Sequence, residues 1–328
     1  SPIGGPVTPL HNLTLVKGGM AMMEFFTAWG NQERRLREEA GIPSAIAGIL
    51  KAPFDIIADK LRGYIGLTVD IFERPDKVRA ACESLAPHLF HVALTSGDPT
   101  GHVPIGFWMH RGCVPFVSHD TFRDVYWATL KPVIEELWRH GRQTLFYAEG
   151  NWDHHLETFA ELPERSIVYH VDKGDIFKAK QILGDKFCLS GGLSNYLLSF
   201  GTPQEVRAAC KKIIRGVAQE GGYIMDAGAI MQNDTKIENI QTMTDATREY
   251  GVFSRGHAPE PAPVGVATAK DIHWMGRPTR NNPGVCQSWE SKKAALPPIN
   301  GDEHLARRIW EQIDGLGNAF IWQILLSF

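Results

Sequence analysis

Polar side chains that could bind a substrate or a metal ion follow several apolar runs of the sequence, each at the carboxyl end of its run. They are His110 and Arg111, then Tyr147, Glu149 and Asn151, then His170 and Asp172, and finally Ser190 and Asp226. In a barrel of parallel strands the carboxyl ends meet at one rim, and active sites are built there. We therefore expect these side chains to surround one pocket.

Glu149 and His170 are the pair most suited to a metal ion. The pattern places them at equivalent positions of consecutive strands, and neighbouring strands lie ~4.8 Å apart. A carboxylate and an imidazole that converge can hold zinc, with Asp226 or Asp172 as a further ligand and one position open for water or substrate. Such an ion would polarise a substrate oxygen. Two alternatives stay open: a hydrogen-bonded pair, or direct binding of a polar substrate.

His110 and Arg111 suit an anionic group of a substrate, because a guanidinium offers a fork of donors to a carboxylate or phosphate. The alternative is that Arg111 pairs with Asp120 or another acid of the same loop. We expect His119 and Asp120 to cap the helix that follows them.

Other notable side chains have structural explanations. We expect the pairs His154-His155 and His88/His91 to be surface histidines, and Trp127 and Trp138 to pack a helix against the sheet. An apolar cluster at Met20, Met22, Met23, Phe25, Phe26 and Trp29 either belongs to the core or lines a hydrophobic pocket.

Short apolar runs alternate with amphipathic helical patterns, which is typical of βα units around a parallel sheet. Strands are expected over residues 45–51, 103–109, 143–148, 166–171, 186–189 and 223–225. Helices are expected over 54–61, 75–90, 120–140, 153–160, 175–183, 203–220, 237–250 and 303–322. Thr202 and Pro203 supply a helix start, and Gly221-Gly222 follows the end of that helix.

The expected strands number six, two fewer than a closed (β/α)8 TIM barrel requires. We place the missing strands in the N-terminal segment, in the tail or in sequence outside this chain. The expected domains are a catalytic barrel over residues 1–253 and a Pro/Gly-rich extension over 254–328 that ends in a helix. The extension either closes one mouth of the barrel or mediates a homodimer contact.

Composition excludes several classes of protein. The 328 residues include 34 Lys+Arg and 37 Asp+Glu, so no excess of positive charge suggests nucleic acid or a membrane surface as a partner. No apolar run approaches the ~20 residues of a membrane span, and no secretory signal is recognisable, so we expect a cytoplasmic location. The five cysteines are scattered without a C-x-x-C pair, which favours buried thiols over disulfides.

Several segments together resemble the uroporphyrinogen decarboxylase superfamily over about residues 45–251. They read KLRGYIGLTVDI (60–71), FERPDKV (72–78), LGDK (183–186), GGL (191–193), GGYIMD (221–226) and NDT with ENI (233–240). The resemblance implies a (β/α)8 barrel. It also implies one of two activities, tetrapyrrole decarboxylation or corrinoid-dependent methyl transfer.

The residues favour the methyltransferase branch. We cannot place the arginine-rich segment and the essential aspartate of the decarboxylases, since 33–37 (ERRLR) is typical of a solvated helix. In the thiol methyltransferases zinc is held by H-x-C-G-N and a later cysteine; here the motif reads Tyr147-Ala148-Glu149-Gly150-Asn151, and the later position falls near Ala229.

The sequence is more similar to enzymes that demethylate aryl methyl ethers, which use glutamate and histidine as zinc ligands twenty residues apart. Twenty residues separate Glu149 from His170. An additional upstream glutamate of those enzymes would fall near Ile134, beside Glu135 and Glu136. Replacing thiolates by harder ligands suits an ether oxygen better than a thiol substrate.

We therefore expect an O-demethylase: a zinc-dependent methyltransferase that activates an aryl methyl ether and passes the methyl group to the cobalt of a corrinoid (cobalamin) protein. Glu149, His170 and Asp226 would carry the metal and the catalysis, and His110, Arg111, Tyr147, Asn151 and Asp172 would bind the substrate. The alternatives are a cofactor-free decarboxylase and a barrel that binds a corrinoid or an aromatic ligand without catalysis. Several arginines around a wide pocket would favour the decarboxylase.

Overall fold

The computed structural model describes residues 9–252 and 286–325. The chain divides into two compact units, Ser1–Ala45 and Ile46–Phe328. In the first unit, helix α1 (Pro9–Glu38) contains the apolar cluster that extends from Met20 to Trp29. The residues of this cluster are 47–72% exposed, so within this unit they are not part of a core.

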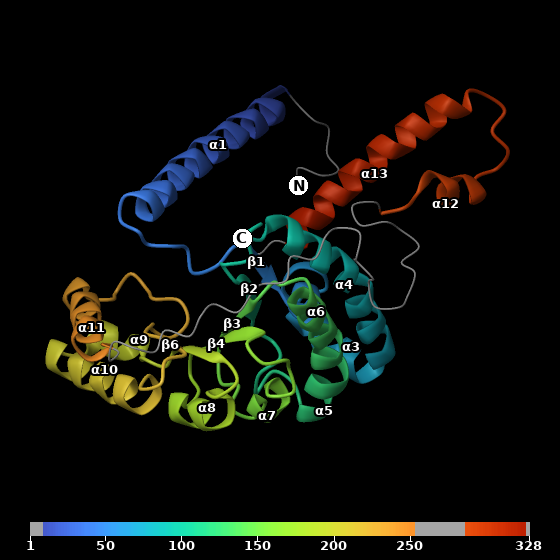
Figure 1. The fold of residues 1–328 in the computed structure, drawn as a ribbon. Helices are drawn as coiled ribbons and strands as arrows, with labels where there is room; N and C mark the ends of the chain where they lie inside the picture. The colour runs from blue at the N-terminus through green and yellow to red at the C-terminus, as the bar shows by residue number, and fades with distance from the viewer. Residues whose placement is uncertain (1–8, 253–285, 326–328) are drawn as a thin grey trace. The chain divides into compact units, whose positions relative to one another are not determined.

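The second unit contains a sheet of six parallel strands, which lie side by side in chain order (Figure 1). The strands are β1 (Ile49–Lys51), β2 (Ile105–Met109), β3 (Thr144–Ala148), β4 (Ile167–Val171), β5 (Cys188–Gly191) and β6 (Tyr223–Ile224). All six expected strands are present, which confirms the α/β class. The sheet is open within the described residues, with β1 and β6 at its edges.

Helices follow the strands and bury them. They are α2 (Pro53–Ile56), α3 (Tyr64–Glu73), α4 (Pro75–Ser96), α5 (His119–Thr121), α6 (Ala128–Arg139), α7 (Leu156–Phe159), α8 (Ile176–Leu183), α9 (Asn195–Phe200), α10 (Pro203–Val217), α11 (Ile237–Tyr250), α12 (Trp289–Ala294) and α13 (Glu303–Leu325). Two π-helical segments, η1 (Ile57–Leu61) and η2 (Phe122–Trp127), continue α2 and α5. Helices α3, α9 and α12 were not predicted.

Most residues of β1 to β5 are buried, whereas neither residue of β6 is. All five residues of β4 are buried. Neighbouring helices pack in the order of the strands, with α4 against α6 and α8 against both α7 and α10 (Figure 1). This alternation brings the carboxyl ends of β2 to β6 to the same edge of the sheet.

Local chemistry sets the helix ends. Thr202 and Glu205 form a reciprocal capping box at the start of α10, with Pro203 at the first helical position, as predicted. Gly221 and Gly222, beyond its end, adopt φ values of 86° and 68°. At α5 the prediction was wrong by one residue: Ser118 is the cap, and its hydroxyl accepts a hydrogen bond from the Thr121 N–H.

The two missing strands are not found in the described parts of the termini. Residues 9–38 form helix α1 instead, so the expectation of a strand there is wrong. The predicted domain boundary at 253/254 lies at the edge of residues 253–285, outside the described part. All five cysteines are free, and three of them, Cys82, Cys113 and Cys210, are buried as expected. No helix of the described residues has the length and apolarity needed to cross a bilayer.

Candidate active site

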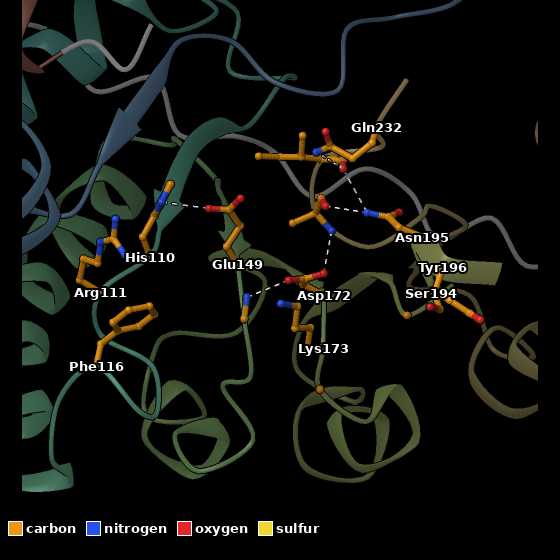
Figure 2. A pocket seen from close by; sticks show the side chains of 15 residues that line it. His110, Arg111, Phe116, Glu149, Asp172, Lys173, Ser194, Asn195, Tyr196 and Gln232 are labelled. Carbon is orange, nitrogen blue, oxygen red and sulfur yellow. Dashed lines mark hydrogen bonds and ion pairs between the residues drawn. The ribbon is translucent and has the colours of Figure 1, made fainter. Parts of the chain in front are cut away.

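A pocket of about 670 Å³ lies at the carboxyl ends of the strands. Its polar lining includes four residues predicted from the sequence (Figure 2). His110 and Arg111 follow β2, Glu149 follows β3, and Asp172 follows β4. Apolar and aromatic groups, among them Phe116, Tyr196 and Ile230, complete the wall. The volume and the mixture of groups are typical of a site for a small molecule.

The Glu149 carboxylate is held by His110. His110 Nδ1 lies 2.9 Å from Glu149 Oε2, and the two side chains are about one-fifth exposed (Figure 2). This hydrogen bond, together with the positive charge of Lys51 and Arg111, keeps the pKa of Glu149 below its usual value although partial burial opposes the shift. Glu149 is therefore ionised at neutral pH and offers a hydrogen-bond acceptor to the pocket.

A partly buried ion pair, Lys51 with Asp59, contacts His110 and Arg111. Lys51, the last residue of β1, donates from Nζ to Asp59 Oδ2 at 2.9 Å and to His110 Nε2 at 3.3 Å. Because an ammonium group only donates, His110 Nε2 is the acceptor from Lys51. The ring proton of His110 is then on Nδ1, which donates a hydrogen bond to Glu149. Partial burial would raise the pKa of Asp59, but the hydrogen bonds from Lys51 and Arg111 outweigh it and lower the pKa.

Arg111 is fixed by three neighbours. Its Nε donates to Asp59 Oδ1 at 3.0 Å. Its guanidinium carbon lies 5.1 Å from the centre of the Tyr64 ring and 5.0 Å from that of Phe116, within the range of cation–π attraction. The predicted alternative partner, Asp120, pairs with Arg123 instead.

Asp55 holds the main chain of the same segment. It is fully buried, and its carboxylate accepts the His110 N–H at 3.1 Å, the Arg111 N–H at 2.7 Å and the Tyr126 hydroxyl at 2.8 Å. Burial raises the pKa of Asp55, and the three donors oppose that shift. Lys51, Asp55 and Asp59 were missed by the sequence analysis, although Lys51 ends a predicted strand and the two aspartates follow it at a helical spacing of four.

His170 lies in a second cluster. Its ring stacks on Tyr147 with 4.7 Å between centroids, and its Nδ1 is 3.2 Å from Ser190 Oγ and 3.8 Å from Asp226 Oδ2. Burial lowers the pKa of His170, while Asp226 and Asp172 oppose the shift. The predicted equivalence of Glu149 and His170 is wrong, because the strand register pairs His170 with Tyr147, two residues before Glu149.

The remaining predicted substrate-binding residues make contacts within the protein. Asp172 accepts the Gly150 and Ala229 N–H groups at 2.8 and 3.0 Å (Figure 2). The Tyr147 hydroxyl accepts the Ile230 N–H at 2.6 Å, and Asn151 is exposed and accepts the Asp153 N–H. Of these three, only Asp172 also lines the pocket.

The expectation that His154 and His155 are both surface residues is wrong for His155. Its ring is 1% exposed and stacks on Phe122, with 3.6 Å between centroids. Burial lowers the pKa of His155 to about 4. His88 and His91 are half-buried rather than exposed. Trp127 is buried in the aromatic cluster around Phe122, as expected for a packing residue.

Residues 31–250 match the protein family described as uroporphyrinogen decarboxylase (URO-D). The matched segment includes all six strands and every residue described above at the pocket. The chain belongs to the uroporphyrinogen decarboxylase family. The resemblance stated from the sequence is confirmed, and with it the α/β barrel class that this family represents.

Individual relatives of the uroporphyrinogen decarboxylase family match less of the chain. Uroporphyrinogen decarboxylases of Chlorobium luteolum and Chlorobium phaeovibrioides are each 31% identical over 78 residues, which are 23% of this chain and 22% of the relative. The chain thus covers about a fifth of the length of these relatives. Among solved structures, a methyltransferase from Methanosarcina mazei has a TM-score of 0.54 at 18% identity, covering 67% of this chain and 63% of that chain. This likeness concerns the fold.

The described residues do not form the three-ligand zinc site that the sequence predicts. No group of three His, Cys, Asp or Glu side chains that could hold a metal ion occurs among them. Glu149 is engaged by His110, whereas His170 is engaged by Ser190 and Asp226. His170 Nε2 is buried and has no partner within the described residues, which is the one feature that suits a ligand.

The additional upstream glutamate of the enzymes that demethylate aryl methyl ethers has no counterpart at the pocket. Ile134 is fully buried in α6. Its neighbour Glu136 is also buried and pairs with His140 and Arg139 on the same helix. Zinc binding remains a prediction from the sequence.

Proposed function

We propose that this chain is a methyltransferase of the uroporphyrinogen decarboxylase family that takes the methyl group from an aryl methyl ether and passes it to the cobalt of a corrinoid protein. The observation that carries the proposal is the ionised Glu149 carboxylate in a small-molecule pocket, held by His110 and accompanied by Arg111 and Phe116. An aromatic molecule with oxygen substituents matches this combination of an acceptor, a cation and an aromatic ring.

The chemistry needs a site that tolerates a departing phenoxide. The bond between the methyl carbon and the ether oxygen breaks, and the oxygen keeps the electron pair. The reduced corrinoid of the partner supplies the nucleophile for the methyl carbon. Arg111 provides positive charge at the pocket, held by Asp59 and two aromatic rings, and Glu149 accepts a hydrogen bond from a ring hydroxyl of the substrate.

Decarboxylation of a multi-carboxylate macrocycle is less well supported. Among the described lining residues the only arginine is Arg111, which is already paired with Asp59, and the only lysine is Lys173. A passive binding barrel is also less well supported, because six lining side chains are ionisable. The small number of cationic lining residues and the ionisable groups beside them both favour a reactive pocket for one small molecule.

The test is a methyl-transfer assay with a reduced corrinoid protein and a panel of methoxylated aromatic compounds. Methylation of cobalt is followed by absorbance. We expect methylation with at least one member of the panel, and failure with every member would contradict the aryl ether proposal.

Metal analysis of the purified protein tests the zinc prediction separately. Zinc in the wild type and its loss in the Glu149→Ala/His170→Ala double variant would support a metal site. No zinc in the wild type, or equal zinc in the double variant, would contradict it without affecting the assay above.

A further inference from the structure

The short segment Ala229–Ile230 is clamped to three separate elements beside the pocket. The Ile230 N–H donates to the Tyr147 hydroxyl on β3 at 2.6 Å, and the Ala229 N–H donates to Asp172 Oδ1 after β4 at 3.0 Å. Asn195 Nδ2, at the start of α9, donates to the Ala229 and Ile230 carbonyl groups at 2.7 and 3.2 Å (Figure 2). Four hydrogen bonds thus hold the main-chain N–H and carbonyl groups of both residues.

The clamp holds Ile230 in a conformation that isoleucine avoids. Its φ is 53°, in the left-handed region, where a β-branched side chain is a true outlier. Arg165, at φ 62°, is the other non-glycine residue with positive φ in the described chain. Such strain persists only where the surroundings determine the conformation, and it concentrates at ligand-binding positions.

The strained residue lies on the pocket wall. Ile230 lines the cavity together with His110, Glu149 and Phe116, and its side chain is 44% exposed. A β-branched side chain has little rotamer freedom, so a fixed backbone also fixes the apolar surface that it presents. The pocket therefore contains one rigid aliphatic surface beside its charged groups.

We propose that Ile230 is a specificity-determining residue, held by the clamp so that its side chain packs against the aromatic ring of the ligand. The ligand class, a small aromatic molecule with oxygen substituents, rests on the proposed function. Ile230 itself does not contact the reacting atoms in this proposal. Its contribution is to favour ligands that contain a flat apolar ring over aliphatic molecules with the same polar groups.

Calorimetric binding of two probes tests this. The probes are 4-methoxybenzoate and methoxyacetate, which share a methoxy group and a carboxylate and differ in the ring. We expect the wild type to bind 4-methoxybenzoate more tightly, and Ile230→Ala and Ile230→Gly to weaken that probe by about tenfold, the usual effect of removing an aliphatic contact from a pocket. Affinity for methoxyacetate should change little.

Arg165→Gly is the matched control, because it relieves the same backbone strain at a position that does not line the pocket. It should leave both affinities unchanged. Ile230→Gly also removes the strain, so its melting temperature should not fall below that of the wild type, and it provides a folded variant even if Ile230→Ala is unstable. The proposal is overturned if 4-methoxybenzoate does not bind the wild type, if both Ile230 variants bind it normally, or if both probes weaken equally.

These measurements need neither turnover nor a corrinoid protein. Binding that depends on Ile230, without methyl transfer, would contradict the proposed function and leave this inference standing. Methyl transfer by the wild type, together with unchanged probe selectivity in Ile230→Gly, would contradict this inference and leave the proposed function standing.

Discussion

Asp55 provides the most direct test of how the fold supports the pocket. In the substitution Asp55→Ala, the N–H groups of His110 and Arg111 and the Tyr126 hydroxyl lose their acceptor inside the protein. Each buried donor left unsatisfied costs about 1–3 kcal/mol, and removing a buried carboxylate returns part of that cost because its desolvation is relieved. We expect the free energy of unfolding to fall by about 3–5 kcal/mol, a large part of the ~5–15 kcal/mol of a typical domain.

Urea denaturation measures this loss, with Asp124→Ala as the control because Asp124 makes only exposed contacts with Arg123. The control should lose no more than about 1 kcal/mol. A double-mutant cycle adds a sharper requirement: Tyr126→Phe should destabilise the wild type but not Asp55→Ala, since the hydroxyl has already lost its acceptor. A loss below about 1 kcal/mol for Asp55→Ala, or additive effects in the cycle, would refute this account of the segment.

Three further predictions concern stability and the support of Glu149. Burial lowers the pKa of His155 to about 4 from 6.5, so as the pH drops the unfolded chain takes up the proton before the folded chain does. The free energy of unfolding should therefore fall by about 3 kcal/mol between pH 6.5 and pH 4. Thermal melts should show that the melting temperature depends less on pH in His155→Phe than in the wild type, and an equal pH dependence would contradict this. Thr202→Ala removes the capping box of α10 and should lower the unfolding free energy by about 1 kcal/mol in urea; no change would show that the cap is dispensable. His110→Phe removes the hydrogen bond to Glu149 and should raise the pKa of Glu149, measurable by carbon NMR of its labelled carboxyl group; an unaltered titration would exclude His110 as the cause.

The strands and most long helices could be predicted because their signal is local. Helix α11 begins and ends at the predicted residues, Ile237 and Tyr250, and β4 is a run of five buried residues, of which four are hydrophobic and one, His170, is polar. Helix α3 was missed because its sequence, YIGLTVDIFE, contains β-branched residues that suit a strand equally well. Its helical state depends on packing against α4, which no local pattern contains.

The site could be predicted only in part, because contacts between elements depend on register. Reading strand ends identified His110, Arg111, Glu149 and Asp172, which line one pocket. It paired Glu149 with His170, whereas the observed register brings Tyr147 beside His170 and leaves Glu149 to His110.

The supporting residues were harder to find than the lining residues. Lys51 and Asp59 gain their role only when β1 lies beside β2 and η1 approaches the end of β2. The sequence spacing shows that two aspartates share a helix face, but it does not show which main-chain groups they accept. His155 was misplaced for the same reason, because its burial depends on Phe122 from another element.

The central claim is that Glu149, held by His110, serves a pocket for methyl transfer from an aryl methyl ether. The measurement that tests it most directly is the rate of cobalt methylation by the wild type, by Glu149→Gln and by Glu157→Gln, an exposed glutamate outside the pocket. Loss of a hydrogen bond to a charged group should slow Glu149→Gln by roughly 10- to 100-fold and leave Glu157→Gln unaffected. Equal rates in all three proteins would contradict the claim.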